Sequence, residues 1–139
     1  MWVKILIGFV VFLGVGGGVA YSYGVRGMKE TLNAHISHVD LQEVADGVYQ
    51  GKYEAGRFRA SVEVTVKDHK IVSIAPLGLN ENKVIDKAIL NVFVPDIGRI
   101  VEAQTPNVDI VSGSTATTKS LLKAVEDALV RAGGKKINE

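Results

Sequence analysis

The chain has 139 residues, of which 47% are hydrophobic and 6% aromatic, and it contains no cysteine. Its 16 Lys and Arg residues against 15 Asp and Glu residues give a formal net charge of +1. A near-neutral chain with few aromatic rings lacks the basic, stacking surface that nucleic-acid binding requires, so we expect no nucleic-acid partner. The lack of cysteine excludes disulfides, thiolate nucleophiles, iron–sulfur clusters and Cys-ligated zinc sites.

Residues 1–25 are expected to form a membrane anchor. Residues 5–25 carry no charge, and as a helix they would extend about 31 Å, close to the roughly 30 Å hydrocarbon core of a bilayer. Trp2 and Tyr21 lie near the two ends, where interfacial aromatic residues are expected. The alternative is a cleaved signal peptide, but its apolar region usually spans only about 7–15 residues. The length of the run therefore favours an uncleaved helix, whose orientation the flanking charges leave open.

Residues 26–45 are more polar and are interpreted as a linker or stalk. Leu32, Ile36 and Val39 recur at helical spacing, so part of the segment is expected to form a helix. His35 and His38 have a spacing that a metal ion can bridge, but without a third ligand nearby we favour a solvated pair.

Three strands are predicted next. Residues 48–53 follow a turn signal and form the first. Residues 58–67 alternate strictly between apolar and polar side chains, which is the pattern of a half-buried strand. Asp68 and His69 then make a tight turn, and residues 70–75 return as the partner strand. One face of this antiparallel pair has to be covered by helices.

The second half of the chain is predicted to supply those helices. Residues 82–93 carry an apolar stripe, Pro95 restarts a short helix, and residues 108–111 form a brief strand. Residues 117–132 form an amphipathic helix that ends at the Gly133–Gly134 pair.

These elements predict an α+β fold. An antiparallel β-hairpin sheet packs against helices in a domain spanning residues 46–134, preceded by one N-terminal transmembrane helix. Residues 135–139 are expected to be a frayed tail.

A hydroxyl-rich segment precedes the last helix and is the strongest candidate site. The first turn of a helix exposes unpaired N–H groups and a partial positive charge, which suit a phosphate. On residue types alone, simple N-capping by Ser or Thr is the favoured alternative. The candidate residues are Asp109, Ser112, Gly113, Ser114, Thr115, Thr117 and Thr118.

The segment from Asp109 to Thr115 resembles the D-x-x-[ST]-G-[AS]-T motif of the FMN-binding domain family. That family includes the G subunit of the Rnf complex and the C subunit of the sodium-pumping NADH:quinone oxidoreductase. Residues 46–51 resemble its opening D-G-x-Y-x-G strand, and residues 62–73 resemble its central hairpin. The likeness extends over about residues 46–130.

The resemblance implies that FMN is attached through its phosphate to Thr115 by a separate flavin transferase. Asp109, Ser112 and Gly113 would complete the sequence that the transferase recognises, and Ser114 stands where the family more often has Ala. Thr117 and Thr118 are rival hydroxyl groups.

Aromatic side chains in the first half of the domain are candidates to stack on the flavin ring. Tyr49, Tyr53 and Phe58 have the required rings, although a place in the hydrophobic core is an equally good expectation for each.

The resemblance also implies a function. We expect a single-pass membrane protein whose extracytoplasmic domain relays electrons from a membrane donor to an acceptor protein, rather than a stand-alone enzyme. One alternative is a membrane-tethered binding or assembly module that keeps the fold without a cofactor. A flavin-dependent reductase is a weaker alternative, because no nucleotide-binding motif is visible.

Overall fold

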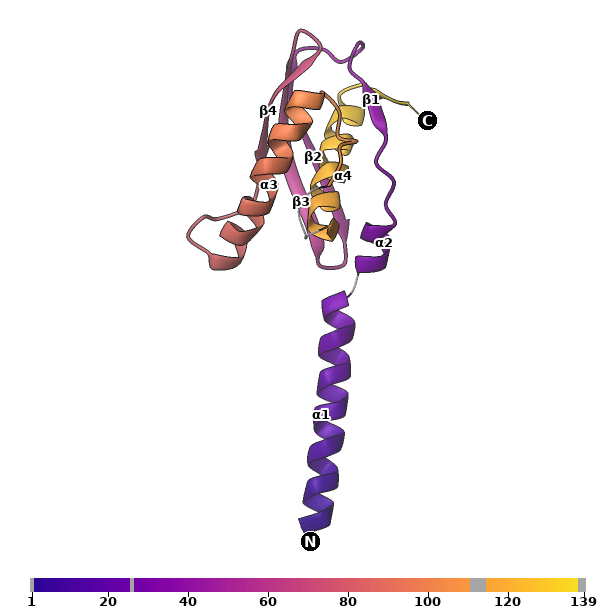
Figure 1. Ribbon diagram of the computed structural model, residues 1–139, viewed down its shortest axis with the longest axis vertical. Coiled ribbons are helices and arrows are strands. Elements are labelled where there is room, and N and C mark those ends of the chain that lie inside the picture. Colours follow the sequence, from indigo (N-terminus) through magenta and orange to yellow (C-terminus); the bar gives the residue numbers. More distant parts are fainter. Residues whose placement is uncertain (1, 26, 111–114, 138–139) are drawn as a thin grey trace.

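The computed structural model describes residues 2–25, 27–110 and 115–137 (Figure 1). Helices and antiparallel strands form one α+β domain, and α1 projects from it as a stem (Figure 1). This architecture confirms the predicted fold class. In chain order the elements are α1 (Trp2–Val25), α2 (Met28–Leu32), β1 (His38–Asp40), β2 (Gly47–Ala55), β3 (Phe58–Lys67), β4 (Lys70–Pro76), α3 (Val84–Ala103), α4 (Thr115–Arg131) and β5 (Lys135–Ile137).

A three-stranded antiparallel sheet in the order β2-β3-β4 forms the centre of the domain. The alternation predicted for β3 is confirmed, because its inward-facing side chains from Phe58 to Val66 are all buried. Asp68 and His69 both adopt left-handed backbone conformations, with φ of 52° and 62°, as a two-residue hairpin turn requires. The predicted antiparallel pair of β3 and β4, joined by a tight turn at Asp68 and His69, is therefore confirmed.

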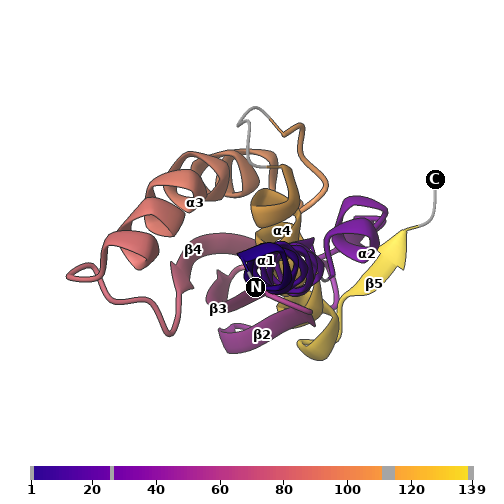
Figure 2. The ribbon, with the colours of Figure 1, turned by 90° about the horizontal axis from the view of Figure 1, so that it is seen from below.

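Helix α4 lies across β2 and β3, and α3 packs along β4 (Figure 2). The predicted inner face of α4 is confirmed, since Leu121, Leu122, Val125 and Leu129 are at most 1% exposed. The helix ends where predicted, with Gly133 in a left-handed conformation at φ 101°.

Helix α3 differs from the prediction, because it runs through Pro95 without a break. Proline removes one backbone hydrogen bond, while Phe93 and Ile100 on either side of it are buried against the sheet and hold the helix together. The expected apolar stripe is also shorter than predicted, because Val84 and Ile85 are 86% and 75% exposed.

The strand predicted at residues 108–111 is not found over residues 108–110, and Val111 lies outside the described residues. Val108 and Ile110 are half-buried against the core. The alternating apolar pattern therefore reflects a loop that packs on the domain without joining a sheet.

The segment interpreted as a linker is part of the domain. Ile36, Val39 and Val44 are buried in the core, and the buried hydroxyl of Thr31 lies 3.0 Å from the hydroxyl of Tyr53. The helical spacing of Leu32, Ile36 and Val39 does not correspond to one helix, because α2 ends at Leu32 and Val39 lies in β1. The packed domain therefore begins near Met28 instead of at residue 46.

The tail expected to be frayed forms a strand as far as Ile137. Residues 135–137 make β5, which pairs antiparallel with β1 in a second, two-stranded sheet. This pairing joins a segment from the start of the domain to one from its end.

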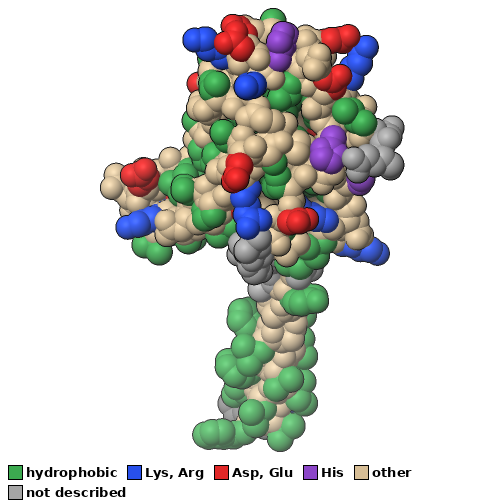
Figure 3. All heavy atoms as spheres, turned by 45° about the horizontal axis from the view of Figure 1, so that its top comes forward, with side chains coloured by type: hydrophobic (Ala, Val, Ile, Leu, Met, Phe, Trp, Pro, Cys, Tyr) green, Lys and Arg blue, Asp and Glu red, His purple; other side chains and the backbone are tan. Residues whose placement is uncertain are grey.

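Helix α1 exposes its apolar side chains from Trp2 to Val19, and Figure 3 shows hydrophobic side chains along the stem. The window from Trp2 to Val19 has a mean hydropathy of 2.0 and none of it is buried. This composition suits a membrane span and equally a signal sequence, so both sequence interpretations stand.

Glu126 joins α4 to both flanking segments. Its carboxylate accepts hydrogen bonds from the Ser37 N–H at 2.9 Å, from Lys123 at 3.1 Å and from Lys136 at 2.9 Å. Burial acts to raise the pKa of Glu126, but the hydrogen bonds from Lys136, Ser37 and Lys123 hold it below the usual value of 4.5.

We predict that Glu126→Gln lowers the free energy of unfolding by about 1–3 kcal/mol at neutral pH, because charge-assisted hydrogen bonds are lost. The folded pKa is lowered, so the wild-type contribution is complete above the unfolded pKa and is lost as the pH falls through the folded pKa. The urea-unfolding difference between the two proteins should shrink below about pH 4.5. Glu43→Gln is the control, because the Glu43–Lys135 pair is exposed and its loss should cost less than about 1 kcal/mol. Equal effects of both variants would contradict the prediction.

Gly51 on β2 permits the close approach of α4. A Cβ at this position would overlap the Ala124 carbonyl oxygen and the Ala128 backbone nitrogen. We predict that Gly51→Ala destabilises the protein by at least about 2 kcal/mol, because backbone has to move. Gly98 in α3 is the matched control, because a Cβ there meets nothing within 4 Å, so Gly98→Ala should stabilise by roughly 0.5–1 kcal/mol. Urea unfolding measures both, and the same sign for the two variants would refute this packing.

Candidate functional site

The hydroxyl-rich segment leads into α4, whose first residue is Thr115. Thr115 is exposed, Thr117 is half-buried and Thr118 is buried. Asp109 lies exposed in the loop before the helix. Ser112, Gly113 and Ser114 lie outside the described residues. The three described threonines, Thr115, Thr117 and Thr118, therefore present their hydroxyl groups in different environments.

Thr118 is directed into the protein. Its Oγ1 donates a hydrogen bond of 3.0 Å to Oδ2 of Asp96 on α3, and these two residues are 0% and 2% exposed. A buried carboxylate that accepts such a bond ties the first turn of α4 to α3. Thr118 thus serves the packing between the two helices.

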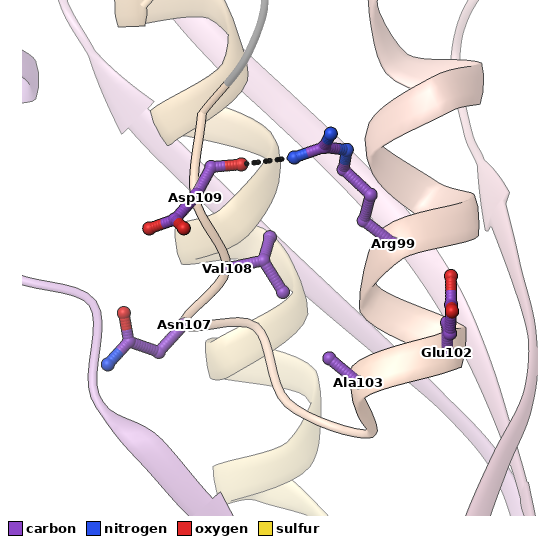
Figure 4. A pocket seen from close by; sticks show the side chains of 6 residues that line it. All are labelled: Arg99, Glu102, Ala103, Asn107, Val108 and Asp109. Carbon is purple, nitrogen blue, oxygen red and sulfur yellow. Dashed lines mark hydrogen bonds between the residues drawn. The ribbon is translucent and has the colours of Figure 1, made fainter.

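Asp109 lies beside α3, on the wall of a cavity of about 440 Å³ (Figure 4). Arg99 points across this cavity and donates from Nη1 to the Asp109 carbonyl oxygen at 3.0 Å (Figure 4). The Asp109 carboxylate points away from Arg99 in the same view. Its side chain is therefore left accessible, while its backbone is held by α3.

Thr115 belongs to a different cavity, of about 320 Å³. Three segments form its walls: α2, the turn between β2 and β3, and the first turn of α4. The lining residues are Met28, Leu32, Arg57, Phe58, Thr115, Ala116 and Thr117. Asp109 and Thr115, which the motif places six positions apart, thus line separate cavities.

This cavity has the chemistry that a flavin nucleotide needs. The guanidinium carbon of Arg57 lies 5.0 Å from the centre of the Phe58 ring, which places a cation and an aromatic side chain on one wall. Met28 and Leu32 add apolar surface, and Thr115 adds an accessible hydroxyl. A phosphate suits the cation and the start of the helix, and the apolar side chains suit a ring system.

Sequence reasoning missed three of these residues. Met28 and Leu32 lie in the segment interpreted as a linker, and Arg57 lies in a hairpin turn, where a basic residue carries no specific signal. Of the three aromatic candidates, Phe58 lines the cavity, but it is only 7% exposed, so the alternative expectation of a core position also holds for it. Tyr49 donates its hydroxyl to the Ala45 carbonyl at 2.7 Å and, like Tyr53, lies among residues packed on the core.

The two histidines of residues 26–45 lie in different surroundings, because His35 is exposed and His38 is half-buried. Within residues 2–25, 27–110 and 115–137, no group of three or more His, Cys, Asp or Glu residues is placed to hold a metal ion. Nδ1 of His38 lies 3.0 Å from the Thr105 hydroxyl. His38 was expected to be solvated, but it is half-buried and hydrogen-bonded to Thr105.

Comparison with known proteins identifies the family. Residues 58–130, just over half of the chain, match the FMN-binding domain family, from the start of β3 to the last turn of α4. This match confirms the resemblance inferred from the motif and indicates that FMN is the cofactor. An uncharacterized protein of Treponema pallidum (strain Nichols) is 27% identical over 127 residues, which are 90% of this chain and 34% of that protein. The chain thus spans about a third of the length of this curated relative.

Proposed function

We propose that this chain, which belongs to the FMN-binding domain family, holds its FMN through a phosphoester bond to the hydroxyl of Thr115. The observation that carries this assignment is the contrast between the hydroxyl-bearing residues of α4. Thr115 is exposed on the wall of a cavity that also holds Arg57 and Phe58, whereas Thr118 is buried against Asp96. A modifying enzyme and its flavin substrate need an accessible hydroxyl.

Attachment of FMN by a flavin transferase is a phosphoryl-transfer reaction. A bond forms between Oγ of Thr115 and the flavin phosphorus, and the threonine proton is lost. The phosphoanhydride bond of an activated flavin nucleotide breaks, and its nucleoside monophosphate leaves. Asp109, Ser112 and Gly113 are the residues that we expect the transferase to recognise. The chain gains one FMN less one water.

The chain's own groups then position the cofactor. The phosphodiester keeps one negative charge at the start of α4, where the helix dipole stabilises it by roughly 0.3–1 kcal/mol. Met28 and Leu32, which line the cavity together with the buried Phe58, offer apolar surface to the ring. When bound, FMN supplies the electron chemistry, and the protein supplies binding, orientation and electrostatics.

We further propose that the domain is anchored in a membrane by α1 and relays electrons between a membrane donor and an acceptor protein. Met28 and Leu32 line the cavity of Thr115 and also a second cavity, which Tyr21 of α1 shares. The proposed flavin site is therefore at the end of the domain from which α1 leaves (Figure 1). A cofactor placed there is close to a membrane-bound donor. The extracytoplasmic side is proposed on the family resemblance.

We predict that co-expression with a flavin transferase increases the intact mass of the full chain by one FMN less one water. The denatured protein band should then fluoresce. Thr115→Val should abolish both signals, because valine keeps the shape but removes the nucleophilic oxygen. Thr117→Val is the matched control, because Thr117 carries a hydroxyl group and lines the same cavity. This variant should retain both signals, because it leaves the hydroxyl of Thr115 in place. Flavin retained by Thr115→Val would reassign the attachment residue. A colourless wild-type chain beside an active transferase would instead favour a cofactor-free binding module.

A further inference from the structure

Arg57 lies in the turn between β2 and β3, whose backbone is held in place by α2. Ala55 pairs with Phe58, so that Gly56 and Arg57 form a two-residue hairpin loop, and Gly56 has a φ of 59°. The start of α2 packs directly on this loop, because a Cβ at Gly27 would overlap the Ala55 carbonyl group. Backbone contacts therefore hold the loop beside the cavity of Thr115.

The charge of Arg57 has no carboxylate partner within residues 2–25, 27–110 and 115–137. Its guanidinium group stacks 5.0 Å above the Phe58 ring, a contact that orients the group and leaves its N–H donors available. Lys119, a cation in the first turns of α4, instead donates to the carbonyl oxygens of Leu32 and Ala34. Arg57 is thus the oriented cation that lines the cavity with Thr115.

We propose that Arg57 binds the phosphate group of the flavin nucleotide and that this contact selects FMN over flavins without a phosphate. The inference rests on the proposed function for the location of the flavin. A guanidinium group matches two phosphate oxygens through paired N–H donors. Arg57 therefore acts as a positioning and specificity residue, which holds the phosphate beside the hydroxyl of Thr115.

Arg59 provides a matched comparison, because it lies two residues further along the same hairpin. It lines a neighbouring cavity between the sheet and α3, which Arg57 also borders, but it does not line the cavity of Thr115. Both arginines are exposed, so neither substitution should prevent folding. If positive charge alone strengthened FMN binding, substitution of Arg57 and substitution of Arg59 would weaken that binding to a similar extent.

The test uses the full chain in nonionic detergent, expressed without a flavin transferase so that Thr115 is unmodified. Flavin fluorescence titrations measure the dissociation constants of FMN and riboflavin, which differ by the phosphate. We expect the wild-type chain and Arg59→Met to bind FMN about tenfold more tightly than riboflavin. Arg57→Met should remove this preference by weakening FMN binding alone, and Arg57→Lys should restore part of it. Added salt should reduce the wild-type preference.

Two results would overturn the role of Arg57. One is a preference for FMN over riboflavin that persists in Arg57→Met, or a preference that is lost to the same extent in Arg59→Met as in Arg57→Met. The other is a wild-type chain that binds both flavins equally or binds neither. The titration does not depend on the phosphoester bond. A chain that remains unmodified beside an active transferase but loses its FMN preference in Arg57→Met would refute attachment at Thr115 and leave the role of Arg57 standing.

Discussion

The packing of α4 on β2 and β3 is the constraint on which the candidate site depends. Ala124 and Ala128 on the helix are fully buried, and Gly51 leaves room for their backbone to reach the strand. Large side chains on both surfaces would hold the two elements further apart. Because this contact fixes the helix along the sheet, it also fixes the first residue of the helix, Thr115, relative to the β2–β3 turn that carries Arg57.

The segment between α1 and the sheet completes the site and connects it to the stem. Thr31 on α2 is buried against Tyr53, and Glu126 holds the chain after α2 through the Ser37 N–H. These contacts place Met28 and Leu32 on the wall of the Thr115 cavity. Met28 and Leu32 thus lie between the proposed anchor and the sheet and also line the proposed flavin site. The short segment that contains α2 therefore links the position of the cofactor to that of the anchor.

Strong local patterns made much of the fold predictable. The alternation in β3, the turn at Asp68 and the apolar face of α4 each depend on neighbouring residues, so the sequence predicts them correctly. The packed segment from residue 28 to 44 was missed, because β1 and α2 are stabilised by partners far along the chain, including residues 135–137. The site divides in the same way. The motif around Thr115 is contiguous and was visible, but Arg57 meets it only through tertiary packing, which no local pattern records.

The most direct test of the account is tandem mass spectrometry of the tryptic peptide of residues 100–119 from chain isolated from cells that contain a flavin transferase. This peptide contains every hydroxyl-bearing candidate residue from Ser112 to Thr118, so fragmentation identifies which of their oxygens is modified. The account predicts one FMN, attached to Thr115. A peptide without flavin, or one with flavin on Thr117, Thr118 or a serine, would contradict it.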